Sequence, residues 1–513
     1  MKGLPIRLSL MKKIVIAFIV SVFFLASCQD RESSAAETIR VAVSQEPPTL
    51  DVMVNTSLIS RIISVGNIYE KLLTMDNAGN IQTELADSYS LSSDSRILTF
   101  RIRDGIRFHD GSLLDPEDAM LSMNRWLDLY KAASDITGGA RFYETEDGIG
   151  ISADCSLSFL PVLIASSPQS AVIMPSEVIK ELDGNEVVTA FIGTGPYMID
   201  KWNAGEKIEL VAFDGYSPYG DKGRARTERL VYFFVPDSVT RSLGMLSGAY
   251  DFANDVMSED RALYSRKDSG VDVIEGAESG SIGIVFNKRE GIGCDAEFRK
   301  AVSLAVDSRK LMKACYGDYG WSIHSDYMEK EQPFSVADWN PYEGQNTEQA
   351  AAALKKSTYN GEKVRILTSN SSNMDKLAVS LADDLGKIGI DAELIVLDWS
   401  SMMARRSDST AWDILISAYS SVPLPQMKLY LSSSYPGWID EDAEGLRIME
   451  GMNYAGYEEG IRIWRDAQHA LWESVPVVVP GHYTTAYAES TSLDGVIINN
   501  GFYFWNAYKK EKR

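Results

Sequence analysis

Apolar and polar residues alternate along several short segments in the first half of the chain. The segments 39–44 and 98–103 show this alternation, and the second runs into an Asp104-Gly105 pair followed by a short apolar segment at 106–108. Alternation with a period of two is typical of strands with one buried face, and an Asp-Gly pair favours a tight turn between two strands. The pattern therefore predicts a β-hairpin here. Further strands are predicted at 207–213, 229–235 and 281–287.

The first clear helix signal follows this predicted hairpin. Asp115 precedes Pro116, and Glu117 and Asp118 stand in the turn that follows. Aspartate is a good N-cap, and proline suits the first helical position because no backbone N–H is needed there. Acidic side chains in the first turn also interact favourably with the helix dipole. These residues predict a helix that runs to about Tyr130.

The period of the apolar residues changes in the second half of the chain. Helices are predicted at 296–306 and 374–388, and the second lies between apolar strands at 364–368 and 390–398. A strand, a helix and a strand in this order form a βαβ unit with parallel strands and a right-handed crossover. This half is therefore expected to be an α/β lobe whose crevice lies at the carboxyl ends of its strands. The prediction is completed by a strand at 412–419, a helix at 458–473, and strand-like segments at 475–483 and 502–505 that return to the first lobe.

The N-terminal segment is expected to be a processed signal. A basic stretch precedes an apolar run at 14–25, which is too short to span a bilayer and ends in small residues before Cys28. This pattern is typical of a bacterial lipoprotein, so residues 1–28 are interpreted as its signal peptide and Cys28 as the acylated residue. An uncleaved membrane anchor is the alternative, and the chain could start at Met11 instead of Met1.

The chain after the signal is expected to consist of a tether and more than one lobe. The polar segment 29–38 has no apolar periodicity and is expected to be a flexible tether. Subtracting 28 signal residues from 513 leaves 485, too many for one hydrophobic core, so two or three lobes are expected.

The formal net charge is −22, and loss of the four basic residues of the signal makes it −26. So acidic a protein is not expected to bind nucleic acid or an anionic lipid surface.

The motifs of common enzyme classes are absent from the sequence. There is no G-x-S-x-G, H-E-x-x-H, C-x-x-C or phosphate-binding G-x-x-x-x-G-K-[ST]. The four histidines stand singly and are expected to be hydrogen-bonded structural or surface residues. They are His109, His324, His469 and His482. No enzyme activity, cofactor or metal site is therefore expected, although a nucleophilic site assembled in space would leave no local motif.

Three cysteines lie after the signal, an odd number at spacings that fit no metal or disulfide framework. Cys155, Cys294 and Cys315 are expected to be small core residues. A Cys294–Cys315 disulfide is the alternative.

Several fragments of the chain carry the pattern of a known family. The central ones are 85–89 (LADSY), 98–111 (LTFRIRDGIRFHDG) and 116–119 (PEDA). Their arrangement resembles the signature of the family-five extracellular solute-binding proteins, the dipeptide, oligopeptide and nickel binders. Fragments in the family's order continue at 44–51 (SQEPPTLD), 69–72 (YEKL), 193–197 (GTGPY), 286–287 (FN), 299–302 (RKAV) and 412–413 (WD). The resemblance covers nearly the whole mature chain.

The resemblance implies an α/β fold of the large peptide-binder class of periplasmic binding proteins. Two unequal lobes would be joined by a two-strand hinge and would close on a solute. Lobe I would comprise 39–285 with an extra subdomain at about 80–190, lobe II would comprise 286–480, and 481–513 would return to lobe I. The implied function is that of a monomeric, lipid-anchored substrate-binding component of an ABC importer, which delivers a small polar solute to permease subunits. A surface ligand sensor with the same fold is the alternative.

The resemblance also suggests ligand-binding residues. Glu46 matches a first-lobe position that borders the ligand, Gln169 lies in a segment that faces the cleft in relatives, and Tyr419 matches an aromatic pocket position. The guanidinium of Arg406 suits a ligand carboxylate. The predicted set is Glu46, Gln169, Trp399, Arg406, Tyr419 and Trp438. Structural alternatives are a solvated acid for Glu46, a core role for Tyr419 and a surface pair with Arg405 for Arg406.

Two features of the family are missing from this chain. Peptide binders carry an Asp after the strand at 412–419 that pairs with the ligand's amino group, whereas 419–425 reads YSSVPLP. Nickel binders carry a His further along, whereas 430–440 contains none. The usual amine anchor and direct metal capture are therefore not expected. Peptide-like or glutathione-like solutes lead the prediction, followed by modified amino acids and sugars.

Overall fold

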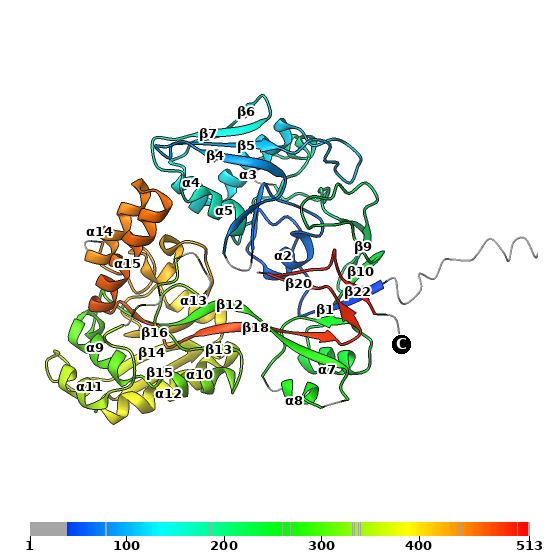
Figure 1. Ribbon diagram of the computed structural model, residues 1–513. Helices are drawn as coiled ribbons and strands as arrows, with labels where there is room; N and C mark the ends of the chain where they lie inside the picture. Colours follow the sequence, from blue (N-terminus) through cyan, green and yellow to red (C-terminus); the bar gives the residue numbers. More distant parts are fainter. Residues whose placement is uncertain are drawn as a thin grey trace, which may run out of the picture.

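The computed structural model describes residues 38–510 apart from 77, 78, 185, 259, 267, 331, 333, 337, 339, 442 and 500. The predicted signal peptide, Cys28 and the tether up to residue 37 lie outside this part. Figure 1 shows two lobes on either side of a central pair of long strands. Within the described part, no helix has both the length and the apolar character needed to cross a bilayer.

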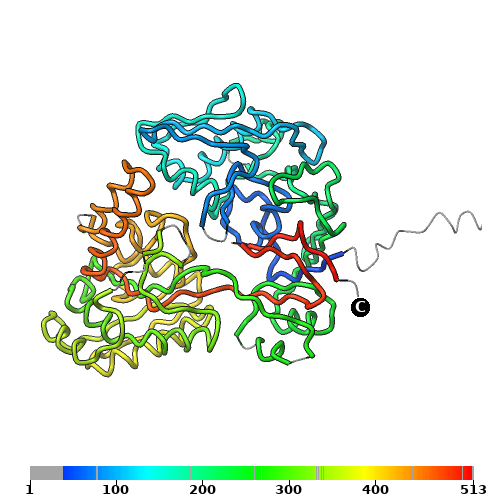
Figure 2. Tube along the Cα trace, viewed as in Figure 1, coloured from blue at the N-terminus to red at the C-terminus, as the bar shows by residue number. Residues whose placement is uncertain are grey.

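One large sheet passes through both lobes. Its strands follow the order β15-β14-β16-β12-β18-β11-β1-β10-β9-β8. The two central strands, β12 (Val271–Phe286) and β18 (His482–Ser490), run from one lobe into the other, as Figure 2 also shows. β12 pairs with β18 through residues 271–281 and with β16 through 280–286. The chain therefore crosses between the lobes in two neighbouring strands, as the implied two-strand hinge requires.

Lobe I is built around the other half of this sheet. Its strands are β1 (Thr38–Val43), β8 (Tyr197–Asn203), β9 (Lys207–Ala212), β10 (Arg229–Phe234) and β11 (Phe252–Ala253), and its helices are α2 (Leu58–Ser64), α7 (Ser238–Leu246) and α8 (Arg261–Tyr264). Ile39, Val41 and Val43 of β1 face the main hydrophobic core, whereas Ala42 faces a second small cluster. The strand predicted at 39–44 is confirmed as β1. Its residues alternate between two faces, and both faces are buried instead of one.

An extra subdomain lies on lobe I, at the top of Figure 1. It has a separate antiparallel sheet in the order β4-β5-β7-β6. Its elements are β4 (Ala86–Leu91), β5 (Ile97–Ile102), β6 (Phe142–Thr145), β7 (Gly148–Ser152), α3 (Pro116–Leu129), α4 (Lys131–Ile136), α5 (Leu160–Ser166) and α6 (Ser176–Lys180), and the short pair β2 (Leu73–Met75) and β3 (Ile81–Thr83) lies beside them.

The hairpin predicted around Asp104-Gly105 is wrong. β5 pairs with β4 on one edge and with β7 on the other, so no edge remains for the segment 106–108. That segment forms only an isolated bridge, between Arg107 and Leu113. The turn itself is present, since Gly105 has a φ of 75°.

The helix predicted after Asp115 is confirmed as α3. The Asp115 carboxylate accepts a hydrogen bond from the backbone N–H of Asp118 (3.1 Å), and the Asp118 carboxylate accepts one from the N–H of Asp115 (2.9 Å). This reciprocal capping box, with Pro116 at the first helical position, fixes the start of the helix. α3 in turn places Trp126 and Arg125 in the interior.

Lobe II is an α/β layer with a hydrophobic core of its own. The predicted βαβ unit is confirmed, because β14 and β15 are parallel, with Val364 opposite Ala392. Its elements are β14 (Val364–Ser369), α12 (Met374–Lys387), β15 (Ala392–Leu397), β16 (Ile414–Ser420), β13 (Trp321–Ser322), β17 (Val477–Val478), α9 (Ala296–Ala305), α10 (Ser308–Tyr316), α11 (Thr347–Leu354), α13 (Trp399–Arg405), α14 (Glu444–Glu450) and α15 (Tyr457–Ser474).

After β18 the chain lies against lobe I in four short strands. They are β19 (Leu493–Asp494), β20 (Ile497–Ile498), β21 (Phe502–Tyr503) and β22 (Tyr508–Lys509). The rings of Phe502 and Phe504 pack on Phe252 of β11, with centroids 4.8 and 5.4 Å away. The aromatic tail therefore closes the core of lobe I, as its strand-like pattern predicted.

The cysteines depart from expectation in part. Cys155, Cys294 and Cys315 are all free, so the alternative of a Cys294–Cys315 disulfide is excluded. Cys315 is buried, as expected of a small core residue, but Cys294 is exposed. Cys294 ends a short 3-10 turn just before the N-cap of α9, and this surface position explains its exposure.

Candidate ligand-binding site

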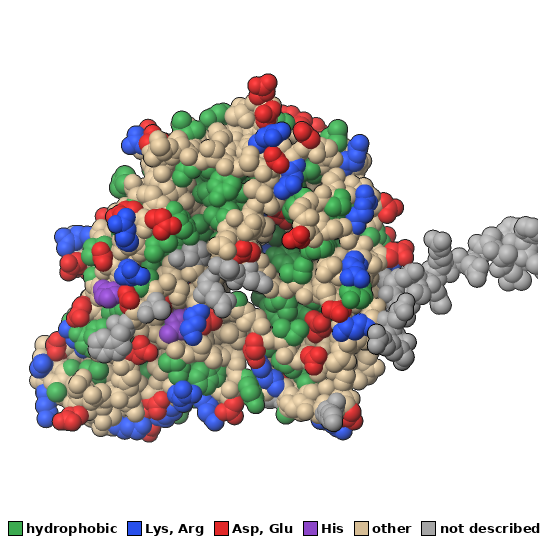
Figure 3. Space-filling view, viewed as in Figure 1, with side chains coloured by type: hydrophobic (Ala, Val, Ile, Leu, Met, Phe, Trp, Pro, Cys, Tyr) green, Lys and Arg blue, Asp and Glu red, His purple; other side chains and the backbone are tan. Residues whose placement is uncertain are grey.

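The lobes touch at a second place, away from the crossing strands. The Ser156 hydroxyl in the subdomain of lobe I donates a hydrogen bond to the carbonyl of Ala455 in lobe II (2.8 Å). The ring of Phe159 packs against Phe334 and Tyr457, with centroids 5.7 and 6.2 Å away. Figure 3 shows that this face of the molecule is hollowed between the two lobes. The space enclosed by the hinge and this contact is where a solute would lie.

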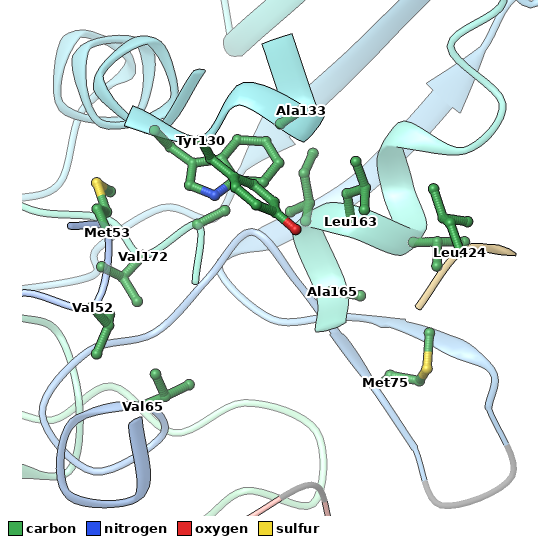
Figure 4. Packing of buried hydrophobic residues seen from close by; sticks show 14 of the residues in the cluster. Val52, Met53, Val65, Met75, Tyr130, Ala133, Leu163, Ala165, Val172 and Leu424 are labelled. Atoms are coloured by element: carbon green, nitrogen blue, oxygen red, sulfur yellow. The ribbon is translucent and has the colours of Figure 1, made fainter. Parts of the chain in front are cut away.

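A small recess with both polar and apolar lining residues opens in lobe I. Figure 4 shows two of its lining residues, Met75 and Ala165, close to Leu424, which comes from lobe II. The polar residues of its wall include Arg61, Lys71, Ser167, Asn499 and Tyr503. They come from α2, from the segment just before β2, from the end of α5 and from the C-terminal segment, so the recess forms only when these distant segments pack together.

Arg61 is the only charged residue of α2, whose sequence is LISRIIS. Its neighbours Ile62 and Ile63 are buried in the core, and the Nε atom of Arg61 is buried without a hydrogen-bond partner. No described residue forms an ion pair with its guanidinium. Burial lowers the pKa of Arg61, with opposing contributions from Tyr503 and Tyr487. An unpaired charge in such surroundings is costly, so an anion in the recess would be stabilised.

Lys71 supplies a second positive charge to the recess. Its side chain is buried, and its ammonium group donates a hydrogen bond to the carbonyl oxygen of Ala165. Burial lowers the pKa of Lys71 from 10.5 to about 8, against the attraction of Glu84 and with the repulsion of Arg61 and Lys222. Lys71 is therefore still charged at neutral pH, and two cations face one small space.

Lobe II contributes a polar group to the interface. Both atoms of the Gln426 side-chain amide are buried and have no partner among the described residues. Gln426 stands between Leu424, which packs in the main core with residues of lobe I, and Met427, whose sulfur lies 3.9 Å from the Tyr130 hydroxyl. Buried polar groups are nearly always hydrogen-bonded. An amide in this place is therefore suited to donate to and accept from a solute held between the lobes.

Comparison with known proteins identifies the family. The model of the bacterial extracellular solute-binding proteins, family 5 (middle region), matches residues 80–440, more than half of the chain. The chain belongs to this family. Among family 5 relatives, the glutathione-binding protein GsiB of Escherichia coli is 23% identical over 96% of this chain and 98% of its own. The probable peptide ABC transporter periplasmic-binding protein y4tO of Sinorhizobium fredii is 24% identical over 93% and 94%.

Solved structures show the fold of this family 5 protein. The ABC transporter substrate-binding protein CtaP of Listeria monocytogenes superposes with a TM-score of 0.81, covering 92% of this chain and 99% of its own at 18% identity. The unliganded open form of the periplasmic murein tripeptide binding protein MppA superposes with a TM-score of 0.75, covering 93% of this chain and 98% of its own at 19% identity. The two-lobed fold of the large peptide binders, inferred from the resemblance, is confirmed.

Two of the predicted ligand residues make contacts inside lobe I. The Glu46 carboxylate accepts hydrogen bonds from the indole of Trp202 (2.8 Å) and the backbone N–H of Gly205 (3.0 Å). The Gln169 amide donates to the carbonyl of Met53 (2.7 Å). Neither residue lines the recess. These contacts favour a structural role for both.

The other four predicted residues lie in lobe II, and the structure brings two of them together. Arg406 donates a hydrogen bond to the Tyr435 hydroxyl (2.6 Å), and the Tyr419 ring meets the rings of Tyr435 and Tyr430 edge-on. Burial raises the pKa of Tyr419 well above its ordinary value. This aromatic cluster is part of the main core.

The two predicted tryptophans stand apart from that cluster. Trp438 is buried and stacks on Trp412, with centroids 5.6 Å apart. Trp399 is exposed at the start of α13. Cys28, the predicted lipidation site, lies outside the described residues.

Sequence reasoning missed Arg61, Lys71 and Gln426. A signal was available for the first, because a single arginine within the apolar segment 58–64 is unusual unless the charge has a use. Lys71 lies in the family fragment 69–72, but nothing in the sequence marks it as buried. For Gln426 no local pattern shows that its amide lacks a partner.

Proposed function

We propose that this chain is the substrate-binding component of an ABC importer and that its solute is a small peptide-like molecule bearing a carboxylate. The observation that carries the proposal is the unpaired guanidinium of Arg61, beside Lys71, in a recess at the inner side of lobe I. Guanidinium groups bind carboxylates through two parallel hydrogen bonds, and the pairing is strong where water is excluded. The glutathione-binding and peptide-transport relatives support this solute class.

Capture would proceed by closure of the two lobes. The solute carboxylate would bind to Arg61 and Lys71 in lobe I, and its amide groups would pair with Gln426 when lobe II closes. Bending at β12 and β18 would allow this closure, since only these two strands carry the chain between the lobes. The missing aspartate after β16 means that the solute's amino group would be held differently from that of an ordinary peptide ligand. No chemical reaction is required of the protein.

The same proposal places the protein outside the cytoplasm, held to the membrane by acyl groups on Cys28. The extracellular description of the family and the lipoprotein pattern before Cys28 support this location. The closed form would then deliver its solute to the permease subunits of the importer.

A ligand screen tests the proposed solute class. The protein would be purified through unfolding and refolding to remove bound solute, and its melting temperature measured with glutathione, dipeptides, tripeptides, sugars and amino acids. A ligand that binds only the folded state raises the melting temperature, and the rise grows with the logarithm of ligand concentration above the Kd. We expect this rise with glutathione or with short peptides.

The matched control is chemical. Each stabilising peptide would be compared with the same peptide carrying a C-terminal amide, which removes one carboxylate and little else. We expect the amide to bind much more weakly. Equal stabilisation by acid and amide would show that the Arg61 recess does not bind the carboxylate, and stabilisation by sugars alone would refute the proposed solute class.

A further inference from the structure

Three side chains that the proposed function does not use converge at the crossing strands. They are Glu278 of β12, His324 just after β13, and His482 at the start of β18. One ligand atom from each of the three lies within 4.8 Å of the others. The three come from segments far apart in the sequence, which is why single-residue reasoning expected no metal site.

His482 is fully buried and holds one ring nitrogen in a fixed role. Its Nε2 lies 3.0 Å from the backbone carbonyl of Asp326, which accepts hydrogen bonds only, so Nε2 carries the proton. In the neutral ring the other nitrogen, Nδ1, therefore presents a lone pair. Metal-binding histidines usually donate a hydrogen bond from their other ring nitrogen to a carbonyl or a carboxylate.

The lone pair of His482 Nδ1 has no hydrogen-bond partner among the described residues. The nearest polar atoms are carboxylate oxygens of Glu278 and Glu329, each 3.8 Å away, and neither supplies a proton. Lys428 neutralises Glu329 at 2.6 Å. An acceptor buried against two other acceptors is unfavourable unless a positive species lies between them.

Glu278 is the second member of the cluster. It pairs with no Lys or Arg in the described chain, and both of its oxygens lie 3.1 Å from Nε2 of His324. The Glu278 carboxylate also accepts hydrogen bonds from the backbone N–H of Lys330 (2.6 Å) and from the Ser322 hydroxyl. The rings of His324 and His482 stack, with centroids 3.8 Å apart and planes within 6°. Both imidazoles are thus held beside one ionised carboxylate.

We propose that Glu278, His324 and His482 bind a divalent transition-metal ion of the zinc type. Two histidines and a carboxylate, with one position left for water, form a ligand set that zinc accepts. In a tetrahedral site with bonds of about 2.0–2.1 Å, ligand atoms lie about 3.3 Å apart. The Glu278 carboxylate lies 3.1 Å from His324 Nε2 and 3.8 Å from His482 Nδ1, both near this spacing. Because the two rings are stacked and His482 is held by its bond to the Asp326 carbonyl, the His324 ring must turn for both lone pairs to meet at the ion.

The location gives the ion a mechanical role. Its ligands come from β12, from β18 and from the segment that follows β13. β13 itself pairs with β18 at Trp321 and Ser322. The ion would therefore join the two strands that connect the lobes, next to the irregular pairing of β12 between Glu275 and Gly280. Binding would stiffen the hinge without contact with the solute recess.

Metal titration of the purified protein tests this inference. After treatment with EDTA, the protein would be titrated with Zn²⁺ by calorimetry and with Co²⁺ by visible absorption. We expect one ion per chain, and Co²⁺ bands of the intensity typical of four-coordinate sites. If the unaltered protein bound neither ion at a ratio of one per chain after this treatment, the proposal would be refuted without any variant.

Two variants and a control locate the site. His324→Ala and Glu278→Gln should each weaken Zn²⁺ binding by at least about 100-fold, because even the outer partners of a metal ligand contribute about 10- to 100-fold. His469→Ala is the matched control, since His469 also faces a carboxylate, Asp338, at 2.9 Å but on the surface. It should bind Zn²⁺ as the unaltered protein does. Unchanged affinity in both His324→Ala and Glu278→Gln would refute the site.

Discussion

The guanidinium groups of Arg125 and Arg61 both lie in lobe I, and their environments are opposite. Arg125, on α3, makes two hydrogen bonds with the Asp51 carboxylate at 3.2 and 2.7 Å, and a third with the carbonyl of Glu186 at 3.0 Å. Arg61, on α2, makes none. The charge of Arg125 is therefore paired within the fold, whereas the charge of Arg61 has no partner among the described residues. The comparison shows that burial alone does not tell whether a charge is free to meet a ligand; the partners of the guanidinium must be known as well.

The largest expected effect is on stability and concerns Arg125, the arginine whose charge is paired. Asp51→Asn leaves Arg125 charged and buried without its counter-ion, which we expect to lower the free energy of unfolding by about 3–5 kcal/mol. Urea unfolding followed by circular dichroism measures this change. The double variant Asp51→Leu with Arg125→Met removes both charges and should recover much of the loss. A loss below about 1 kcal/mol in Asp51→Asn would show that the pair is not essential to the lobe.

The next effect concerns the unpaired group. Arg61→Met should weaken binding of a carboxylate-bearing solute by about 2–5 kcal/mol, measured by calorimetry with the ligand found in the screen. The stability of the solute-free protein should stay the same or rise, because the variant removes an uncompensated charge. Arg405→Met, on the exposed last turn of α13, is the control and should change neither quantity. A large loss of solute-free stability in Arg61→Met would make Arg61 a structural residue like Arg125.

The pH dependence of ligand affinity should also distinguish the recess, which contains Lys71, from the Asp51–Arg125 pair. Lys71 has a pKa of about 8, so it loses its charge as the pH rises through that value. Carboxylate affinity should fall by up to about tenfold between pH 7 and pH 9, and Lys71→Gln should remove the dependence.

The stability of the solute-free protein should change in the opposite direction. Because the pKa of Lys71 is lower in the folded than in the unfolded chain, the folded state binds fewer protons between about pH 8 and 10.5. The contribution of Lys71 to stability therefore rises with pH across that range. An affinity that is constant from pH 7 to 9 would exclude Lys71 from the binding site.

The smallest effect tests the helix that carries Arg125. Asp115→Ala removes one half of the capping box of α3 and should cost about 1 kcal/mol of stability. Solute affinity should stay unchanged, because α3 does not line the recess. Urea unfolding and calorimetry on the same preparation measure both. A loss of affinity would mean that α3 positions the recess as well as the core.

The sequence predicted local elements well where each residue type had a local reason. Asp115 and Pro116 determine the start of α3 through hydrogen bonds within one turn, and Gly389 follows α12 as a left-handed stop at φ 91°. The hairpin prediction at Asp104-Gly105 failed because β4 and β7, both distant along the chain, occupy the edges of β5. Strand pairing is a non-local property, and periodicity does not report it.

The candidate site was harder to predict for the same reason. Tyr419 and Arg406 were expected near the ligand from their place along the chain, and the structure does bring them together around Tyr435. The unpaired state of Arg61, by contrast, depends on every side chain that packs around α2. Resemblance to the family supplied the fold, but the partners of an individual charge follow only from three-dimensional packing.

The two crossing strands also determine which contacts between the lobes are the most sensitive. When the lobes rotate about β12 and β18, each atom moves by the rotation angle multiplied by its distance from that axis. Ser156 and Phe159 precede α5, which lies away from β12 and β18 in Figure 1. Their contacts with lobe II therefore lie at the end of a lever arm. A rotation about the two strands would separate these contacts before it disturbed groups close to the axis.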